Sequence, residues 1–106
     1  MKLGICIYSS EPETIWSAFR LANISHEAGD TTTVFLISQG VEAEERTTEQ
    51  FDIRGLMQKF IDAGGRISAC TTCLRLRNAG ETPLCNASGI RELYEMLTTY
   101  DKVISF

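Results

Sequence analysis

The sequence predicts an α/β fold of three layers, in which helices cover both faces of a mostly parallel sheet of four to five strands. Apolar, β-rich runs alternate along the chain with segments of helical periodicity. No repeat, low-complexity tract or change in composition interrupts this alternation. Alternating strands and helices favour parallel pairing through right-handed crossovers. The 106 residues are therefore predicted to form a single domain, 1–106.

The first strand is predicted over 2–8, because this run is almost continuously apolar, as in a strand buried on both faces. Ser10, with Glu13 three residues later, has the spacing of a capping box and predicts the start of a helix. Apolar residues at helical spacing continue that helix: Ile15, Ala18, Phe19 and Ala22. Gly29 is expected to end it, and a second β-rich run predicts a strand over 32–38.

The next segment, 39–50, is polar and is predicted to be a loop or a short exposed helix. A second amphipathic helix follows, with these apolar residues: Ile53, Leu56, Met57, Phe60 and Ile61. Asp52 is its expected N-cap, and Phe51 is expected to pack against Leu56. The pair Gly64-Gly65 is expected to end this helix.

A third strand is predicted over 66–69. After a loose stretch at 80–89, a last helix is predicted from four apolar residues, with Ser88 as its N-cap: Ile90, Leu93, Tyr94 and Leu97. A fourth strand is predicted over 102–106. These elements complete the order β-α-β-α-β-α-β.

Two cysteines follow the third strand directly, in Cys70-Thr71-Thr72-Cys73. In parallel sheets ligands and reactive groups gather at the carboxyl ends of the strands. The segments 9–11 and 39–42 are predicted to reach the same edge. We therefore expect the chemistry of this protein at that edge.

Cys70 is the predicted nucleophile. Its place at the start of a helical turn, with Arg75 and Arg77 nearby, is a setting that lowers the pKa of a thiol. Cys73 lies one turn further on, where it either resolves an oxidised Cys70 through a disulfide or merely fills space.

The composition excludes several classes of protein. The net charge of −4 argues against direct nucleic-acid binding. No apolar run approaches the ~20 residues that a membrane span requires, and the N-terminus is not of the signal-peptide type. A cytoplasmic, reducing location is predicted, where four cysteines indicate catalysis, redox chemistry or metal binding rather than structural disulfides.

Nearly the whole chain resembles the DsrE/DsrF-like family of small α/β sulfur-relay proteins. The resemblance includes the opening strand, the second strand running into 39–42, Gly64-Gly65 before the third strand, and the cysteine at the end of that strand. Its most specific part is 69–77, which is similar to the family pattern Cys-x-x-(Cys or Ala)-x-x-x-Arg-Gly. Asn78 stands where the family often has Gly.

The resemblance implies a flavodoxin-like or DsrE-like fold and a persulfide carrier. Cys70 would attack the outer sulfur of a donor persulfide and hand that sulfur to an acceptor protein, and Arg77 would match the Arg of the pattern. The implied partners are sulfur donor and acceptor proteins and further copies of the chain, as a dimer, trimer or hexamer. Whether the protein is an enzyme, as a sulfurtransferase, is left open.

Other interpretations of the cysteines remain open at this point. The thiols of Cys70 and Cys73 would also suit a thiol–disulfide redox protein, or be incidental to a non-enzymatic oligomeric binding module. Together with Cys85 they would supply three thiolates, but a closed zinc site needs four ligands and His26 has no partner at metal spacing, so no metal is predicted. Cys6 lies mid-strand and is predicted to be core.

No cofactor is predicted either. The loop 9–14 lacks the glycines of a phosphate loop, and Glu11 and Glu13 would repel the phosphate of FMN. Trp16 is predicted to lie in the core or at a subunit interface, and Tyr94 in the core.

Overall fold

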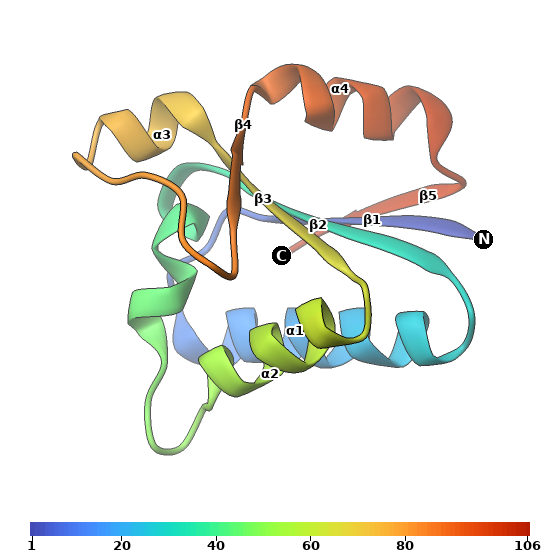
Figure 1. The fold of residues 1–106 in the computed structure, drawn as a ribbon, viewed down its shortest axis with the longest axis horizontal. Helices are drawn as coiled ribbons and strands as arrows, with labels where there is room; N and C mark the ends of the chain where they lie inside the picture. Colours follow the sequence, from blue (N-terminus) through green and yellow to red (C-terminus); the bar gives the residue numbers. More distant parts are fainter.

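The computed structural model describes residues 1–106 and contains one five-stranded sheet in the order β4-β3-β2-β1-β5 (Figure 1). All four neighbouring pairs are parallel. The strands are β1 (Lys2–Ile7), β2 (Thr31–Leu36), β3 (Arg66–Cys70), β4 (Asn86–Ser88) and β5 (Lys102–Ser105). The helices are α1 (Pro12–Glu27), the 3-10 helix η1 (Ser38–Arg46), α2 (Ile53–Asp62), α3 (Thr71–Arg75) and α4 (Ile90–Thr99). The predicted α/β fold is confirmed.

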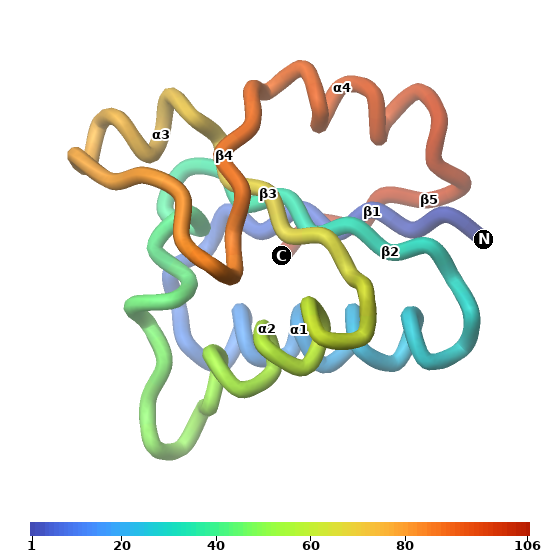
Figure 2. Tube along the Cα trace, viewed as in Figure 1, coloured from blue at the N-terminus to red at the C-terminus, as the bar shows by residue number.

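The helices form two layers, one on each side of the sheet. Figures 1 and 2 show α1 and α2 on one face and α4 on the other, while the short helix α3 lies beyond the end of β3. The chain builds the sheet from β1 outward to β4, and α4 then carries it back across the opposite face to place β5 beside β1. Since parallel crossovers are right-handed, reversing the direction of travel moves the connecting helix to the other face.

Side chains of each strand alternate between these faces and divide the interior in two. A cluster of 17 buried residues, to which Val34 and Leu36 belong, lies on the side of α1 and α2. Phe35 points the other way, into a small cluster with Cys70 and Met96. The thiol of Cys70 is thereby placed on the α4 side of the sheet.

Most helices begin and end close to the residues that the sequence predicts. Asp52 caps α2 as predicted, since its carboxylate accepts the Gly55 N–H at 3.0 Å. Gly29 and Gly64 adopt left-handed φ values of 95° and 98° where α1 and α2 end, which confirms the predicted stops. The N-cap of α1 was predicted one residue too early: Glu11, not Ser10, accepts the Thr14 N–H, at 2.8 Å.

Aromatic packing differs from expectation near the start of α2. The ring of Phe51, expected against Leu56, packs at a tilt against half-buried Trp16, with 5.3 Å between centroids. The guanidinium of Arg20 lies over the ring of Trp16, 4.5 Å from its centroid. Trp16 therefore has partners within its own chain.

The segment before α4 holds the strand that the sequence did not predict. Asn86–Ser88 pairs with β3 as the edge strand β4, too short and polar to be recognised as a strand. The predicted cap Ser88 is wrong: Gly89 is the N-cap of α4, without a side-chain hydrogen bond. Tyr94, predicted as core, is 64 % exposed, because the row Ile90, Tyr94 and Leu97 faces outward. Met96 is the residue that α4 buries against the sheet.

No helix of the protein combines the length and apolar character needed to cross a membrane.

Candidate functional site

Cys70 is the last residue of β3 and lies inside the protein. Only 4 % of the residue is exposed, and it belongs to the cluster with Phe35 and Met96 beneath α4. It occupies the N-cap position of α3 with an extended backbone, but its side chain makes no capping hydrogen bond. Because α3 has only five residues, its dipole offers little support to an anion at this position.

Cys73 lies one turn later and is half-buried. It lines an open depression of about 410 Å³ together with Tyr8, Ser38, Gln39, Leu76 and Arg77. Its inner side also packs against the cluster that contains Cys70. The two thiols of the motif are thus neighbours in different settings: one is enclosed by apolar side chains, and the other is open to molecules from outside.

The sulfur of Cys73 has a backbone donor. The N–H of Ser38 points to Sγ at 3.3 Å. Ser38 is the first residue of η1 and has a left-handed φ of 54°. Since the first N–H groups of a helix have no acceptor within it, the thiol of Cys73 serves as that acceptor.

Gly40 allows η1 to approach the sheet closely enough for this contact. A Cβ at position 40 would lie 2.0 Å from the carbonyl oxygen of Ile7, closer than any real Cβ contact. The Gly40 N–H also donates to the Ile37 carbonyl at 2.9 Å. The glycine therefore seats the first turn of η1 against the end of β1, beside Tyr8.

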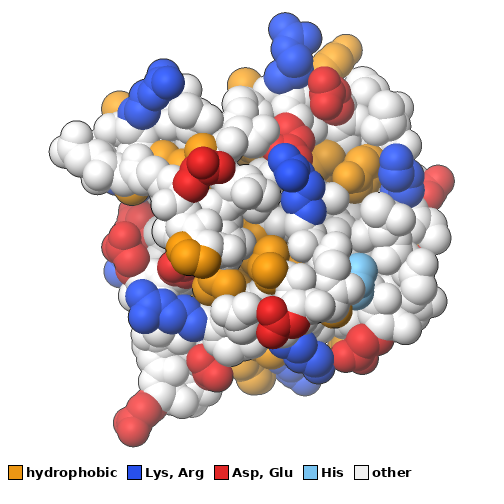
Figure 3. All heavy atoms as spheres, in the orientation of Figure 1, with side chains coloured by type: hydrophobic (Ala, Val, Ile, Leu, Met, Phe, Trp, Pro, Cys, Tyr) orange, Lys and Arg blue, Asp and Glu red, His pale blue; other side chains and the backbone are white.

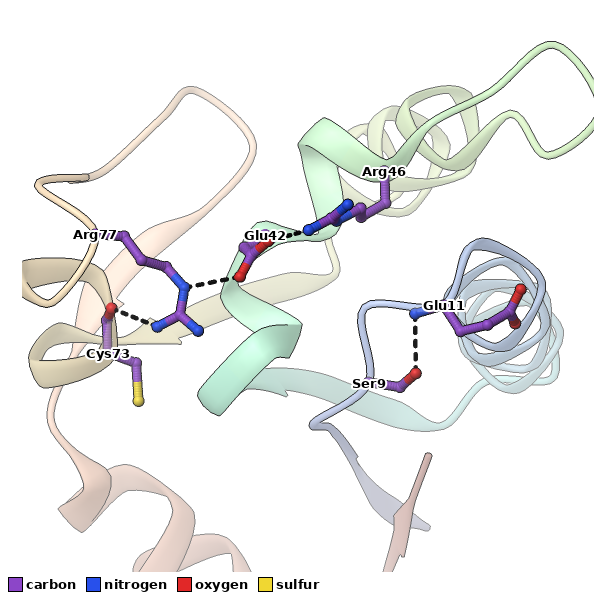
Figure 4. Close-up of polar contacts among 6 residues, drawn as sticks. All are labelled: Ser9, Glu11, Glu42, Arg46, Cys73 and Arg77. Carbon is purple, nitrogen blue, oxygen red and sulfur yellow. Dashed lines mark hydrogen bonds and ion pairs between the residues drawn. The ribbon is translucent and has the colours of Figure 1, made fainter.

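Arg77 connects α3 to η1. Its Nε donates to Glu42 at 2.9 Å, and its Nη1 donates to the backbone carbonyl of Cys73 at 3.0 Å. Glu42 also pairs with Arg46, and Figure 4 shows the Cys73 thiol pointing away from the Arg77 guanidinium. Hydrogen bonds from Arg77, then from Arg46, hold the pKa of Glu42 below its usual range. Arg77 thus positions the turn that carries Cys73. That Arg77 or exposed Arg75 also stabilises a thiolate directly stays a prediction.

Asn78 completes the turn after α3 with a φ of 52°. Its N–H donates to Arg75 and the Ala79 N–H donates to Leu74, at 3.1 and 2.9 Å. This is the hydrogen-bond pattern of a helix ending in a left-handed residue, which is usually Gly and sometimes Asn. Asn78 therefore makes the left-handed turn that ends α3.

The other two cysteines lie apart from this pair. Cys85 belongs to the large cluster on the α1 and α2 side. Burial, and then the charges of Glu44 and Glu81, raise its pKa to about 12, so it is a neutral thiol at physiological pH. Cys6 is buried in β1 as predicted, and burial raises its pKa.

The zinc ligands considered from the sequence do not converge. Cys85 and Cys70 lie on opposite sides of the sheet, and no group of three or more His, Cys, Asp and Glu side chains is placed to hold a metal ion. Half-buried His26 is engaged elsewhere, with Nε2 2.6 Å from the Ala63 carbonyl oxygen at the end of α2.

Two residues of the depression were not predicted. Tyr8 and Ser38 follow β1 and β2, and no local pattern marks either as part of a site. In the loop 9–11, which also follows β1, the Ser9 hydroxyl accepts the Glu11 N–H at 3.0 Å, a contact within the loop itself (Figure 4). Only knowledge that β1, β2 and β3 are adjacent would have placed Tyr8 and Ser38 near Cys73.

Comparison with known proteins places this geometry in a family. Two solved structures are similar along nearly their whole length. The YchN protein of E. coli is 21 % identical with a TM-score of 0.84, covering 100 % of both chains. The conserved protein of unknown function BT1422 from Bacteroides thetaiotaomicron is 19 % identical with a TM-score of 0.83, covering 99 % of this chain and 94 % of its own. No curated protein matches. At these identities the two structures establish the shared fold, while the model of the DsrE/DsrF-like family matches residues 1–106 and shows that the chain belongs to that family.

Proposed function

We propose that this protein is a cytoplasmic sulfur relay, which accepts sulfane sulfur as a persulfide on the Cys70–Cys73 pair and passes it to an acceptor protein. Family membership supports a role of the sulfur-relay type in general. The observation that carries the proposal is the pairing, at the carboxyl end of β3, of an enclosed thiol with an open one. A carrier needs both: access for its partners and a place where the persulfide is shielded.

The transfer is a pair of displacements at sulfur. A thiolate of the pair attacks the outer sulfur of a donor persulfide, the S–S bond of the donor breaks, and the donor leaves as a thiolate. An acceptor thiolate then attacks the terminal sulfur, and the cysteine of the carrier leaves in turn. No net oxidation occurs in either step. Phe35 and Met96 around Cys70 exclude water and stray thiols, which favours Cys70 as the holder of the persulfide, in agreement with the family resemblance.

The same two cysteines also allow a redox reaction that ends in a disulfide. If Cys73 attacks the inner sulfur of a Cys70 persulfide, sulfide leaves and a Cys70–Cys73 disulfide remains. The packing of Cys73 against the cluster of Cys70 favours this as the second candidate reaction. The two reactions leave different masses on the protein.

Intact-protein mass spectrometry after incubation with polysulfide tests the proposal. We expect a gain of one sulfur mass that reductant removes and that the double variant Cys70→Ser/Cys73→Ser lacks. Cys6→Ser is the matched control, since Cys6 is also a buried thiol of the sheet, and it should load like the wild type. A loss of two hydrogens without a gain of sulfur would indicate the redox protein. Absence of any change would leave a binding module with incidental thiols.

We further infer that the chain assembles with copies of itself through α4. The outward row of this helix is apolar: Ile90, Tyr94 and Leu97. Arg91 and Glu95 flank the row on one side, one turn apart. In Figure 3 hydrophobic atoms emerge among charged ones at the top of the molecule, over α4.

The charges select an antiparallel pairing of two α4 helices. In such a pair the same flank of each helix faces its copy, so Arg91 lies opposite Glu95 of the second copy and Glu95 opposite its Arg91. The same pairing brings the apolar rows of the two α4 helices against each other. The face is therefore complementary to itself in charge and apolar where the two rows meet.

Sedimentation analysis of charge variants tests this contact. Arg91→Glu is expected to weaken the oligomer and Arg91→Glu/Glu95→Arg to restore it, because only the double variant keeps opposite charges face to face. Leu97→Glu should give the monomer. A monomeric wild type, or an oligomer unaffected by Leu97→Glu, would contradict the contact.

A further inference from the structure

We infer that Cys73, not Cys70, takes the sulfur from the donor, and that Cys70 then receives it from Cys73. This order rests on the proposed function and divides the work of the pair between a receiving thiol and a holding thiol. Three features of the site support it: the exposure of each sulfur, the backbone donor on one of them, and the surface around it.

Access favours Cys73. Displacement at a persulfide requires the attacking sulfur to approach in line with the S–S bond that breaks. Cys73 lines the open depression of about 410 Å³, where such an approach is free. Cys70 is 4 % exposed and enclosed by Phe35 and Met96, so an external persulfide cannot align with it in this conformation.

The Ser38 N–H favours the same residue. It lies 3.3 Å from Sγ of Cys73, and hydrogen bonds to a charged acceptor are roughly twice as strong as neutral ones. The attacking thiolate is therefore held and oriented by a backbone group that Gly40 seats against the sheet. No side-chain cap or backbone donor of this kind is found on Cys70.

The rim of the depression indicates the kind of donor. Tyr8 and Leu76 are 57 % and 77 % exposed, while the guanidinium of Arg77 is paired with Glu42. Two exposed apolar side chains beside polar Ser38 and Gln39, with the one cation paired, fit a protein-borne cysteine persulfide better than an anionic small-molecule donor. Cys73, on the wall between this surface and the inner cluster, is then the first thiol that such a persulfide meets.

The handover inside the protein balances without a co-reactant. The Cys70 thiolate attacks the terminal sulfur of the Cys73 persulfide, the bond between that sulfur and Cys73 Sγ breaks, and Cys73 leaves as a thiolate. One S–S bond forms as one breaks, so neither an oxidant nor a reductant is consumed. The proton of the persulfide stays on the transferred sulfur.

Initial rates of loading by a persulfidated cysteine peptide with apolar flanking side chains test the order, with the loaded residue identified by fragmentation of the tryptic peptide 67–75, which contains both cysteines. Cys70→Ser should load within about twofold of the wild-type initial rate, on Cys73, whereas Cys73→Ser should load at least about tenfold more slowly. Cys73→Ser that loads Cys70 at the wild-type rate would overturn the inference and leave the proposed function standing. Failure of both single variants and of the wild type would overturn both.

A second measurement does not depend on a substitution. Time-resolved alkylation of the wild-type protein by iodoacetamide should label Cys73 before Cys70, because the reagent meets the same barrier as the donor. Labelling of Cys70 first would overturn the order. Thr72→Ser, a change at an exposed residue between the two cysteines, is the control and should leave both rates unchanged.

Discussion

Asn78 provides a quantitative test of how the turn behind the site is built. Its φ of 52° lies in the left-handed region, where a side chain with an ordinary Cβ costs about 1–2 kcal/mol. Asn tolerates this conformation better than Ala, and Gly adopts it freely. We therefore expect Asn78→Ala to lower the free energy of unfolding by about 1 kcal/mol, or the Tm by about 4–8 °C. Asn78→Gly should stay within about 0.5 kcal/mol of the wild type, because its freedom in the unfolded chain offsets the relief of strain.

Urea denaturation followed by circular dichroism measures both values. Asn86→Ala is the matched control, since Asn86 is also exposed but lies in the extended strand β4, and it should change the free energy of unfolding by less than about 0.5 kcal/mol. Asn78→Ala that is as stable as the wild type, together with a destabilised Asn78→Gly, would refute the role assigned to this turn.

Three further predictions concern the surroundings of the thiols. Gly40→Ala should destabilise the protein by about 1–3 kcal/mol or more, because its Cβ would overlap the Ile7 carbonyl, and an unchanged urea midpoint would contradict that close approach. The lowered pKa of Glu42 means that its contribution to stability is complete above its unfolded pKa of 4.5 and is lost as the pH falls through the lower folded value. Urea midpoints taken between about pH 6 and pH 2 should therefore fall less steeply for Glu42→Gln than for the wild type, and parallel curves would argue against the pairing with Arg77. Cys85, with a pKa of about 12, should remain unmodified by iodoacetamide at pH 8 while Cys73 reacts, and peptide mapping that finds Cys85 labelled first would contradict its burial.

Most of the fold follows from local patterns in the chain. Continuous apolar runs marked the long strands, and Gly29 and Gly64 marked the ends of α1 and α2 because a left-handed residue is needed there. The edge strand β4 escaped prediction because it is short and is held by pairing with β3 rather than by an apolar pattern of its own. The apolar row of α4 was taken for its buried face, since periodicity shows that a helix has an apolar side but not what covers that side.

The candidate site was predictable only in part. The position of the C-x-x-C motif at the end of a parallel strand placed both cysteines at the reactive edge. Which thiol is enclosed depends on the alternation of side chains along β3 and on the return of α4 over that face. The Ser38 N–H and the ring of Tyr8 come from neighbouring strands, and the pairing of Arg77 with Glu42 spans 35 positions, so none of these contacts has a local signal.

The central claim is that the Cys70–Cys73 pair carries sulfane sulfur, and the most direct test is the sulfur content of each cysteine peptide in protein isolated from its own cells without reductant. Trypsin separates the cysteines into three peptides, 3–20 with Cys6, 67–75 with the pair, and 78–91 with Cys85. After alkylation, the account predicts an additional sulfur mass on peptide 67–75 that is absent from the other two. No additional sulfur on 67–75, or an equal amount on all three peptides, would contradict the account.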